Sequence, residues 1–136
     1  MQTSISRILS GLFLGLILPG AGHVLYGRKD KAVYFGVLLL TTFVAGLWLG
    51  DWRVVSTERF PLYLLAQCWL GLPVGIALAA TSALRITTDI PYLDAGLLYT
   101  CVAGLLNLVV LVDLYEIHVK IRTGAAAPSK TAGATA

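Results

Sequence analysis

The sequence predicts an all-α fold, an integral membrane bundle of four helices. Of its 136 residues, 57% are apolar and only 12% are charged, whereas a soluble domain has roughly 25% charged residues. A water-soluble fold of this size would therefore expose large apolar patches and aggregate. The apolar residues also fall into four long runs, each able to cross a hydrocarbon core of about 30 Å as a helix. These two observations exclude an ordinary soluble enzyme and predict a multi-pass membrane protein.

The predicted spans cover about residues 4–26, 32–50, 62–84 and 93–112. Because the connecting loops are short, neighbouring helices should run antiparallel in a compact bundle. Trp and Tyr side chains near the ends of the runs match the aromatic belts of membrane interfaces. A cleaved secretory signal is the rival interpretation of the first run, whose apolar stretch follows Arg7 and ends in small residues.

The fourth span continues into a segment, residues 113–122, that alternates polar and apolar side chains. It extends the helix past the bilayer, so that the transmembrane domain comprises residues 1–122. Residues 123–136 are rich in Ala, Thr and Gly and lack apolar periodicity. We expect this tail to be flexible or bound to a partner.

The ten Lys and Arg residues, which give a net charge of +3, flank the apolar runs. They indicate attraction to a membrane surface and not a nucleic-acid site. Four spans would divide nine of them almost evenly, with Arg7, Arg53, Arg59, Lys120 and Arg122 on one side and Arg28, Lys29, Lys31 and Arg85 on the other, and with Lys130 left out as too distant from the spans. The first helix alone has one basic residue before it and three after it, which favours a cytoplasmic basic turn and external termini.

The two halves of the chain resemble each other. Segments 42–47 and 100–105 share Thr, Val, Ala, Gly and Leu in the same order, and each follows a span that carries a proline, Pro19 or Pro73. The halves would then be two tandem helical hairpins in parallel orientation, related by an axis along the membrane normal. Chance similarity between apolar segments is the alternative.

The most distinctive segment is residues 18–31, where a proline and three glycines interrupt an apolar run. Proline removes a backbone donor and glycine weakens a helix, so we expect a kink, a break or a tight re-entrant turn near Pro19. Broken helices at membrane depth can form substrate sites. The favoured interpretation is a simple bend with close helix contact, because neighbouring spans lack the ionisable residues of transport sites.

This segment resembles the signature of small bacterial membrane proteins related to the TM2 domain. The matching residues are Pro19, Gly20, Gly22, His23, Tyr26, Gly27 and Arg28, with the tyrosine displaced by one position from its commoner place. The resemblance covers roughly residues 8–50. It implies two apolar helices joined by a cytoplasmic basic turn in a bacterial cytoplasmic membrane, in a family whose members are mostly uncharacterised.

Small residues at helical spacing indicate close helix packing. Gly71 and Gly75 form such a pair in the third span. On the fourth span, an arc of about 60° at 100° per residue contains Gly96, Thr100, Ala103 and Asn107. This stripe should face protein, because the Asn107 amide needs a hydrogen-bonding partner away from lipid. We expect that partner to be Gln67 or a group on another chain.

No residue pattern predicts catalysis, a cofactor or a metal site. His23 lies within the first span and His118 beyond the fourth, and a metal needs three or four ligands in one place. Asp113 directly follows the fourth span, and Lys120 lies on the same helical face. We therefore expect an interfacial carboxylate and not a proton relay.

With no pattern for catalysis, a cofactor or a metal, the function that the sequence predicts is contact with other helices. The sequence predicts an accessory or scaffolding subunit of a larger membrane complex, and no enzyme, because the loops are too short to build a catalytic site. The lipid bilayer and other membrane subunits are the expected partners, with a homo-oligomer as a further option and no nucleic acid. The alternative function is a small oligomeric transporter or channel-like protein lined by Thr41, Thr42, Gln67 or Asn107.

Overall fold

The computed structural model describes residues 2–56, 61–82 and 91–124, and every regular element in these ranges is helical. The all-α prediction is therefore confirmed. The elements in chain order are α1 (Gln2–Ile17), the 3₁₀ helix η1 (Ala21–Tyr26), α2 (Lys29–Leu49), α3 (Pro61–Gln67), the 3₁₀ helix η2 (Cys68–Leu70), α4 (Leu72–Ser82) and α5 (Leu93–Arg122). This order differs from the four continuous helices that the sequence predicts.

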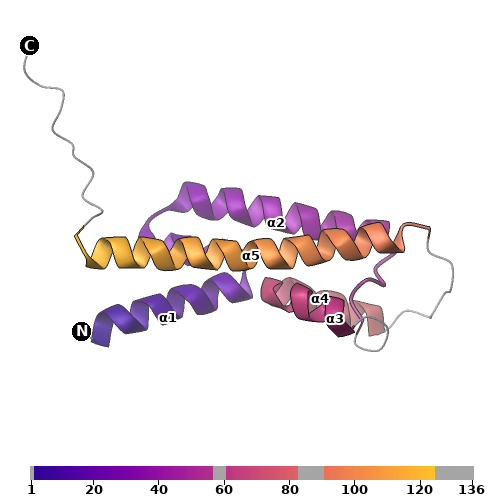
Figure 1. The fold of residues 1–136 in the computed structure, drawn as a ribbon, viewed down its shortest axis with the longest axis horizontal. Helices are drawn as coiled ribbons and strands as arrows, with labels where there is room; N and C mark the ends of the chain where they lie inside the picture. Colours follow the sequence, from indigo (N-terminus) through magenta and orange to yellow (C-terminus); the bar gives the residue numbers. More distant parts are fainter. Residues whose placement is uncertain (1, 57–60, 83–90, 125–136) are drawn as a thin grey trace, which may run out of the picture.

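Two long helices, α2 and α5, lie side by side along the length of the molecule (Figure 1). Within the described ranges, they are the two helices long and apolar enough to cross a membrane. Their 21 and 30 residues correspond to lengths of about 31 and 45 Å. They run antiparallel and approach closely where Gly46 meets Gly96, since a Cβ on Gly96 would lie 2.7 Å from the Gly46 carbonyl oxygen.

The first predicted span, residues 4–26, is wrong as a single crossing helix. Helix α1 ends at Ile17, and the chain turns back so that η1 runs alongside α1 in the opposite direction. Gly20 makes this turn with φ of 80°, and a Cβ there would lie 2.5 Å from the carbonyl oxygen of Ala32. Gly22 then lies against the backbone of Gly11, too close for any side chain. The glycines therefore reverse the chain, which goes beyond the simple bend that the sequence favoured.

The third predicted span, residues 62–84, is also wrong as one helix. Helix α3 and η2 run parallel to α5, because Cys101 contacts the carbonyl oxygen of Tyr63 and Asn107 that of Trp69. The chain then reverses at Gly71, with φ of 70°. Helix α4 returns to the end from which α3 started.

The two hairpins, α1–η1 and α3–η2–α4, enter the molecule from opposite ends and meet tip to tip halfway along α5 (Figure 1). At the meeting point, a Cβ on Gly71 would collide with the carbonyl group of Leu16. Each half of the chain thus has a short helix, a reversal and a long helix. The halves are inverted relative to each other, because α2 and α5 are antiparallel, so the predicted parallel relation is wrong.

This course also moves the basic turn. Because η1 returns to the end where α1 begins, the turn at residues 27–28 lies at the same end as α1's start and α5's last residue, Arg122 (Figure 1). The four-span prediction had separated the turn from both termini. The tail prediction falls on residues 125–136, which lie outside the described residues.

The apolar core lies toward the other end. Leu39, Phe43 and Leu47 of α2 pack with Leu97 of α5 and with Leu70 at the tip of the second hairpin. At the opposite end of the molecule, polar contacts hold the first hairpin to the long helices.

Candidate functional site

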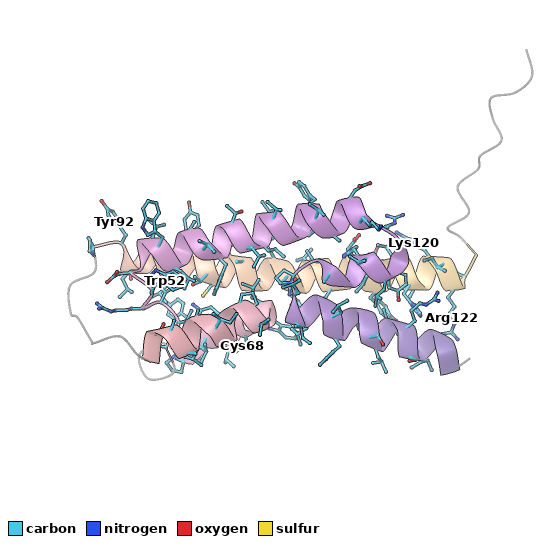
Figure 2. All side chains as sticks on the ribbon, turned by 180° about the vertical axis from the view of Figure 1, so that it is seen from behind. Trp52, Cys68, Tyr92, Lys120 and Arg122 are labelled. Carbon is cyan, nitrogen blue, oxygen red and sulfur yellow. The ribbon has the colours of Figure 1, made fainter. Side chains whose placement is uncertain are left out.

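A cluster of polar side chains joins the first hairpin to both long helices. We call it the basic-end cluster, and it consists of His23 and Tyr26 of η1, Lys31 of α2, and Asp113 and His118 of α5. Figure 2 labels Lys120 and Arg122 at the end where it lies, and Trp52 and Tyr92 at the opposite end.

Asp113 is the centre of the basic-end cluster. Its carboxylate accepts two hydrogen bonds from the Lys31 ammonium group, at 2.8 and 3.0 Å, and lies 2.9 Å from His23 Nε2. The His23 side chain is 1% exposed and that of Asp113 is 33% exposed. The carboxylate thus bridges a buried imidazole and a lysine at the protein surface. Such charge-assisted bonds are roughly twice as strong as neutral ones.

A second pair extends the cluster along α5. The Tyr26 hydroxyl lies 2.9 Å from His118 Nδ1, and the two rings meet edge to face at 85°. The His118 side chain is largely buried. Because η1 has only six residues, these contacts fix its middle and its last residue onto α5.

The motif of residues 18–31 explains why the cluster forms. Gly20 and Gly22 let η1 fit between α1 and α2, where a side chain would strike backbone atoms. Gly27, with φ of 72°, ends η1 and redirects the chain into α2. Arg28 precedes the first turn of α2, and its N–H bonds the His23 carbonyl. The motif therefore builds a docking element for α5.

The sequence indicated the position of Asp113 near a helix end but not its partners. Lys120, predicted to share its face, pairs instead with Glu116 at 3.2 Å. The partners of Asp113 come from the other end of the chain, and only the reversal at Pro19 and Gly20 brings them there. Two features of the sequence could have indicated these partners. A histidine lies within one apolar run, and a lone carboxylate lies at the edge of another apolar run.

A second polar centre lies where the two hairpins meet. Asn107 Nδ2 donates to the carbonyl oxygens of Gly15, at 3.2 Å, and Trp69, at 2.7 Å. Gln67, which the sequence offered as the partner of Asn107, bonds Thr100 Oγ1 at 2.8 Å and the Val54 carbonyl at 3.2 Å. The predicted pairing of Gln67 with Asn107 is therefore wrong. Each side-chain amide instead donates to backbone carbonyl oxygens in a different part of the molecule.

The predicted packing stripe lies inside the chain. Gly96, Thr100, Ala103 and Asn107 are all buried. Gly71 lies at the tip of the second hairpin, whereas Gly75, the other member of the predicted small-residue pair, faces open space. No residue of this stripe is available to another chain in this conformation.

The chemistry within reach of the basic-end cluster is proton binding and charge pairing. His23 Nδ1 is buried without a hydrogen-bond partner among the described residues. Within the same described ranges, no group of three His, Cys, Asp or Glu side chains is arranged to hold a metal ion. The contacts of Asp113 with Lys31 and His23 hold α5 to α2 and η1, and we call them the Asp113 latch.

The profile of a family described as "Family of unknown function (DUF6677)" matches residues 10–127 of the chain. No curated protein and no solved structure matches the chain. The matched residues include the second half of α1, η1, the second hairpin and both long helices. The family description does not bear on the TM2 resemblance, which stays a prediction.

Proposed function

Because the chain belongs to the DUF6677 family, whose description names no activity, we propose a function from its own architecture: an accessory or scaffolding subunit of a larger membrane complex, acting through helix packing. In this proposal α2 and α5 cross the bilayer, and the two hairpins enter it from opposite faces. The proposal rests on one observation. Polar side chains inside the molecule form hydrogen bonds within the chain, whereas large apolar side chains lie on its outer surface.

The exterior supports a lipid environment. Large apolar side chains are exposed on helices throughout the molecule, including Phe13 at 66%, Trp48 at 81% and Leu62 at 78%. Only 28% of the most apolar window of α2 is buried inside the chain, whereas the core helix of a soluble protein would be mostly buried. In water this surface would drive aggregation, and in a bilayer it contacts acyl chains.

Charge supports one orientation. Of the basic residues that the structure describes, Arg7, Arg28, Lys29, Lys31, Lys120 and Arg122 lie at the end of the basic-end cluster, and Arg53 lies at the other. Arg59, Arg85 and Lys130 fall outside the described residues. The positive-inside rule then puts the basic end, with the start of α1 and the end of α5, in the cytoplasm of a bacterial cell. This orientation replaces the one that the first helix alone favoured.

The two hairpins are consistent with burial in a bilayer. Irregular backbone at membrane depth is tolerated only where protein or water satisfies its polar groups. Asn107 supplies donors to the free carbonyl oxygens of Gly15 and Trp69, and Gln67 to that of Val54. These two amide nitrogens thereby help to hold the fold, and contact with a partner is left to the outer surface.

The outward face of α2 is the surface we propose for a partner helix. Val33, Val37, Val44 and Trp48 are each more than half exposed and recur along one side of that helix. In lipid, helix association depends on packing and not on a hydrophobic drive. A ridge of β-branched residues of this kind gives a rigid contact surface.

The alternative, a small oligomeric transporter or channel, retains less support. Of its four expected pore-lining residues, Gln67 and Asn107 have side chains that are fully buried within one chain, whereas Thr41 is exposed on α2. Thr42 donates to the carbonyl of Leu38 in its own helix. A pore lined by the two amides would require opening the hairpin tips.

Native mass spectrometry after gentle detergent extraction tests the proposal. We expect a complex containing at least one other membrane protein, and a photo-crosslinker at Val37 should form an adduct with it. A crosslinker at Leu105, exposed on α5, is the matched control. A discrete homo-oligomer without other chains would contradict the subunit function.

A further inference from the structure

A groove runs along the surface between α1 and α5 at the basic end of the molecule. It has a volume of about 770 Å³, and its walls include Leu9, Phe13, Leu108 and Val112. Phe13, Leu9 and Val112 are each more than half exposed, so the groove is open along its length. Residues of η1 do not line the groove, because η1 packs against α1 and α5 on the opposite side of this helix pair.

The groove has a polar end and an apolar end. Ser10 and Tyr115 line its outer part, whereas Leu16 and Trp69 line its inner part, where the two hairpins meet. From residue 9 to residue 16, α1 advances about 10 Å. The groove therefore leads from the proposed membrane surface toward the centre of the bilayer.

Two arginines continue the walls of the groove outward. Arg7 lies three residues before Ser10 on α1, and Arg122 lies seven residues after Tyr115 on α5, so each falls on the same helical face as its groove residue. Both are exposed, and in the described ranges neither guanidinium forms an ion pair. Nearby carboxylates are already engaged, Asp113 by Lys31 and Glu116 by Lys120.

We propose that this groove binds one acyl chain of an anionic phospholipid, whose phosphate is held by Arg7 and Arg122. The proposal rests on the membrane placement proposed above. The apolar walls fit a hydrocarbon chain, and two unpaired guanidinium groups at the outer end complement a phosphate, which arginine binds in bidentate geometry. The Tyr115 hydroxyl lies in the outer part of the groove, where the polar part of the lipid would begin.

Trp69 provides a probe inside the groove. The chain has three tryptophans, so the Trp48→Phe and Trp52→Phe replacements leave Trp69 as the only one. We expect its fluorescence, in full-length protein reconstituted in phosphatidylcholine, to be quenched more by a small fraction of phosphatidylglycerol with brominated acyl chains than by the same fraction of brominated phosphatidylcholine. Equal quenching by the two lipids would overturn the proposal.

Charge variants separate a site from general surface attraction. Arg7→Gln and Arg122→Gln should each lower the preference for the anionic lipid about ten-fold or more, the loss of a charge-assisted hydrogen bond to the bound phosphate. The matched control is the double variant Arg28→Gln and Lys29→Gln, which removes two charges at the same end away from the groove and should leave the preference unchanged. An equal loss in the control would show attraction by surface charge alone and contradict a site.

Flotation with liposomes in the same preparations distinguishes the two proposals. Protein that floats and resists alkaline carbonate but shows no lipid preference refutes the lipid site and leaves the membrane placement standing. Protein that carbonate removes from the liposomes refutes the membrane placement and the lipid site together. Val112→Phe, which adds bulk inside the groove without changing charge, should reduce quenching while flotation stays the same.

Discussion

The side-chain amide of Asn107 lies 2.7 Å from the carbonyl oxygen of Trp69, and the same nitrogen reaches the carbonyl oxygen of Gly15. One side chain on the continuous helix α5 thus donates hydrogen bonds to the backbone near the tips of both hairpins. This contact joins the tips of both hairpins to the middle of α5.

Replacing Asn107 by leucine should destabilise the fold. The change removes both hydrogen bonds and leaves two buried carbonyl groups without a donor, a loss of about 1–3 kcal/mol. Reversible unfolding in mixed micelles measures it. Thr42→Val is the matched control, because the Thr42 hydroxyl bonds only the Leu38 carbonyl in its own helix and its loss should change stability by less than about 0.5 kcal/mol. Equal effects of the two variants would contradict a bridging role for Asn107.

Gly71→Ala and Gly75→Ala should have opposite effects. The first forces a side chain into the backbone of Leu16 at a residue with φ of 70°, whereas the second adds a methyl group in open space within α4. We expect Gly71→Ala to prevent the hairpin tips from meeting and to lower the melting temperature strongly. Gly75→Ala should be neutral or stabilising by up to about 1 kcal/mol, the helix preference of alanine over glycine. Comparable melting temperatures for both variants would refute the tip-to-tip contact.

Lys31 and Asp113 should be energetically coupled. A double-mutant cycle with Lys31→Met and Asp113→Asn is expected to give a coupling of about 1 kcal/mol, because both groups are partly exposed and solvent screens them. The Lys120 and Glu116 pair on the outside of α5 is the control, and its coupling should be only about 0.3–0.5 kcal/mol. A coupling for Lys31 and Asp113 no larger than the control would show that the latch contributes little.

Cysteine labelling should find the basic turn and the end of α5 on the same side of the membrane. Cys68 and Cys101 are replaced first, and single cysteines are then introduced as Lys29→Cys, Thr123→Cys and Trp52→Cys. An impermeant reagent should label positions 29 and 123 from the same side and position 52 from the other. Four crossing helices would instead put positions 29 and 123 on opposite sides.

The helical class and the two long helices could be predicted from the sequence, because hydrophobic runs of sufficient length are a local property. A re-entrant turn near Pro19 was one of the alternatives that the sequence left open, but the choice among them and the reversal at Gly71 could not be predicted. Gly20 and Gly71 reverse the chain with positive φ, where backbone atoms of Ala32 and Leu16 leave no room for a side chain, and no local pattern reports a neighbour that is distant along the chain. A proline and glycines in an apolar run are compatible with both a bend and a hairpin.

The polar residues show the same limit. Helical periodicity brings Thr100 and Asn107 to one face of α5, and both are buried. Their partners depend on how deeply each hairpin enters, so Asn107 bonds the backbone of Gly15 and Trp69 where Gln67 of the third span or another chain was expected. Asp113 was expected to share a face with Lys120, but it pairs with Lys31, which reaches it only after the first hairpin has folded back.

The meeting of the two hairpins has a consequence for how the chain is made. Gly15 leaves the ribosome 92 residues before Asn107, the side chain that bonds its carbonyl oxygen. Until α5 is synthesised, the first hairpin has neither this donor nor the Asp113 contacts to hold it in place. The fold of the N-terminal half is therefore incomplete during synthesis, and the last helix completes the structure of the first.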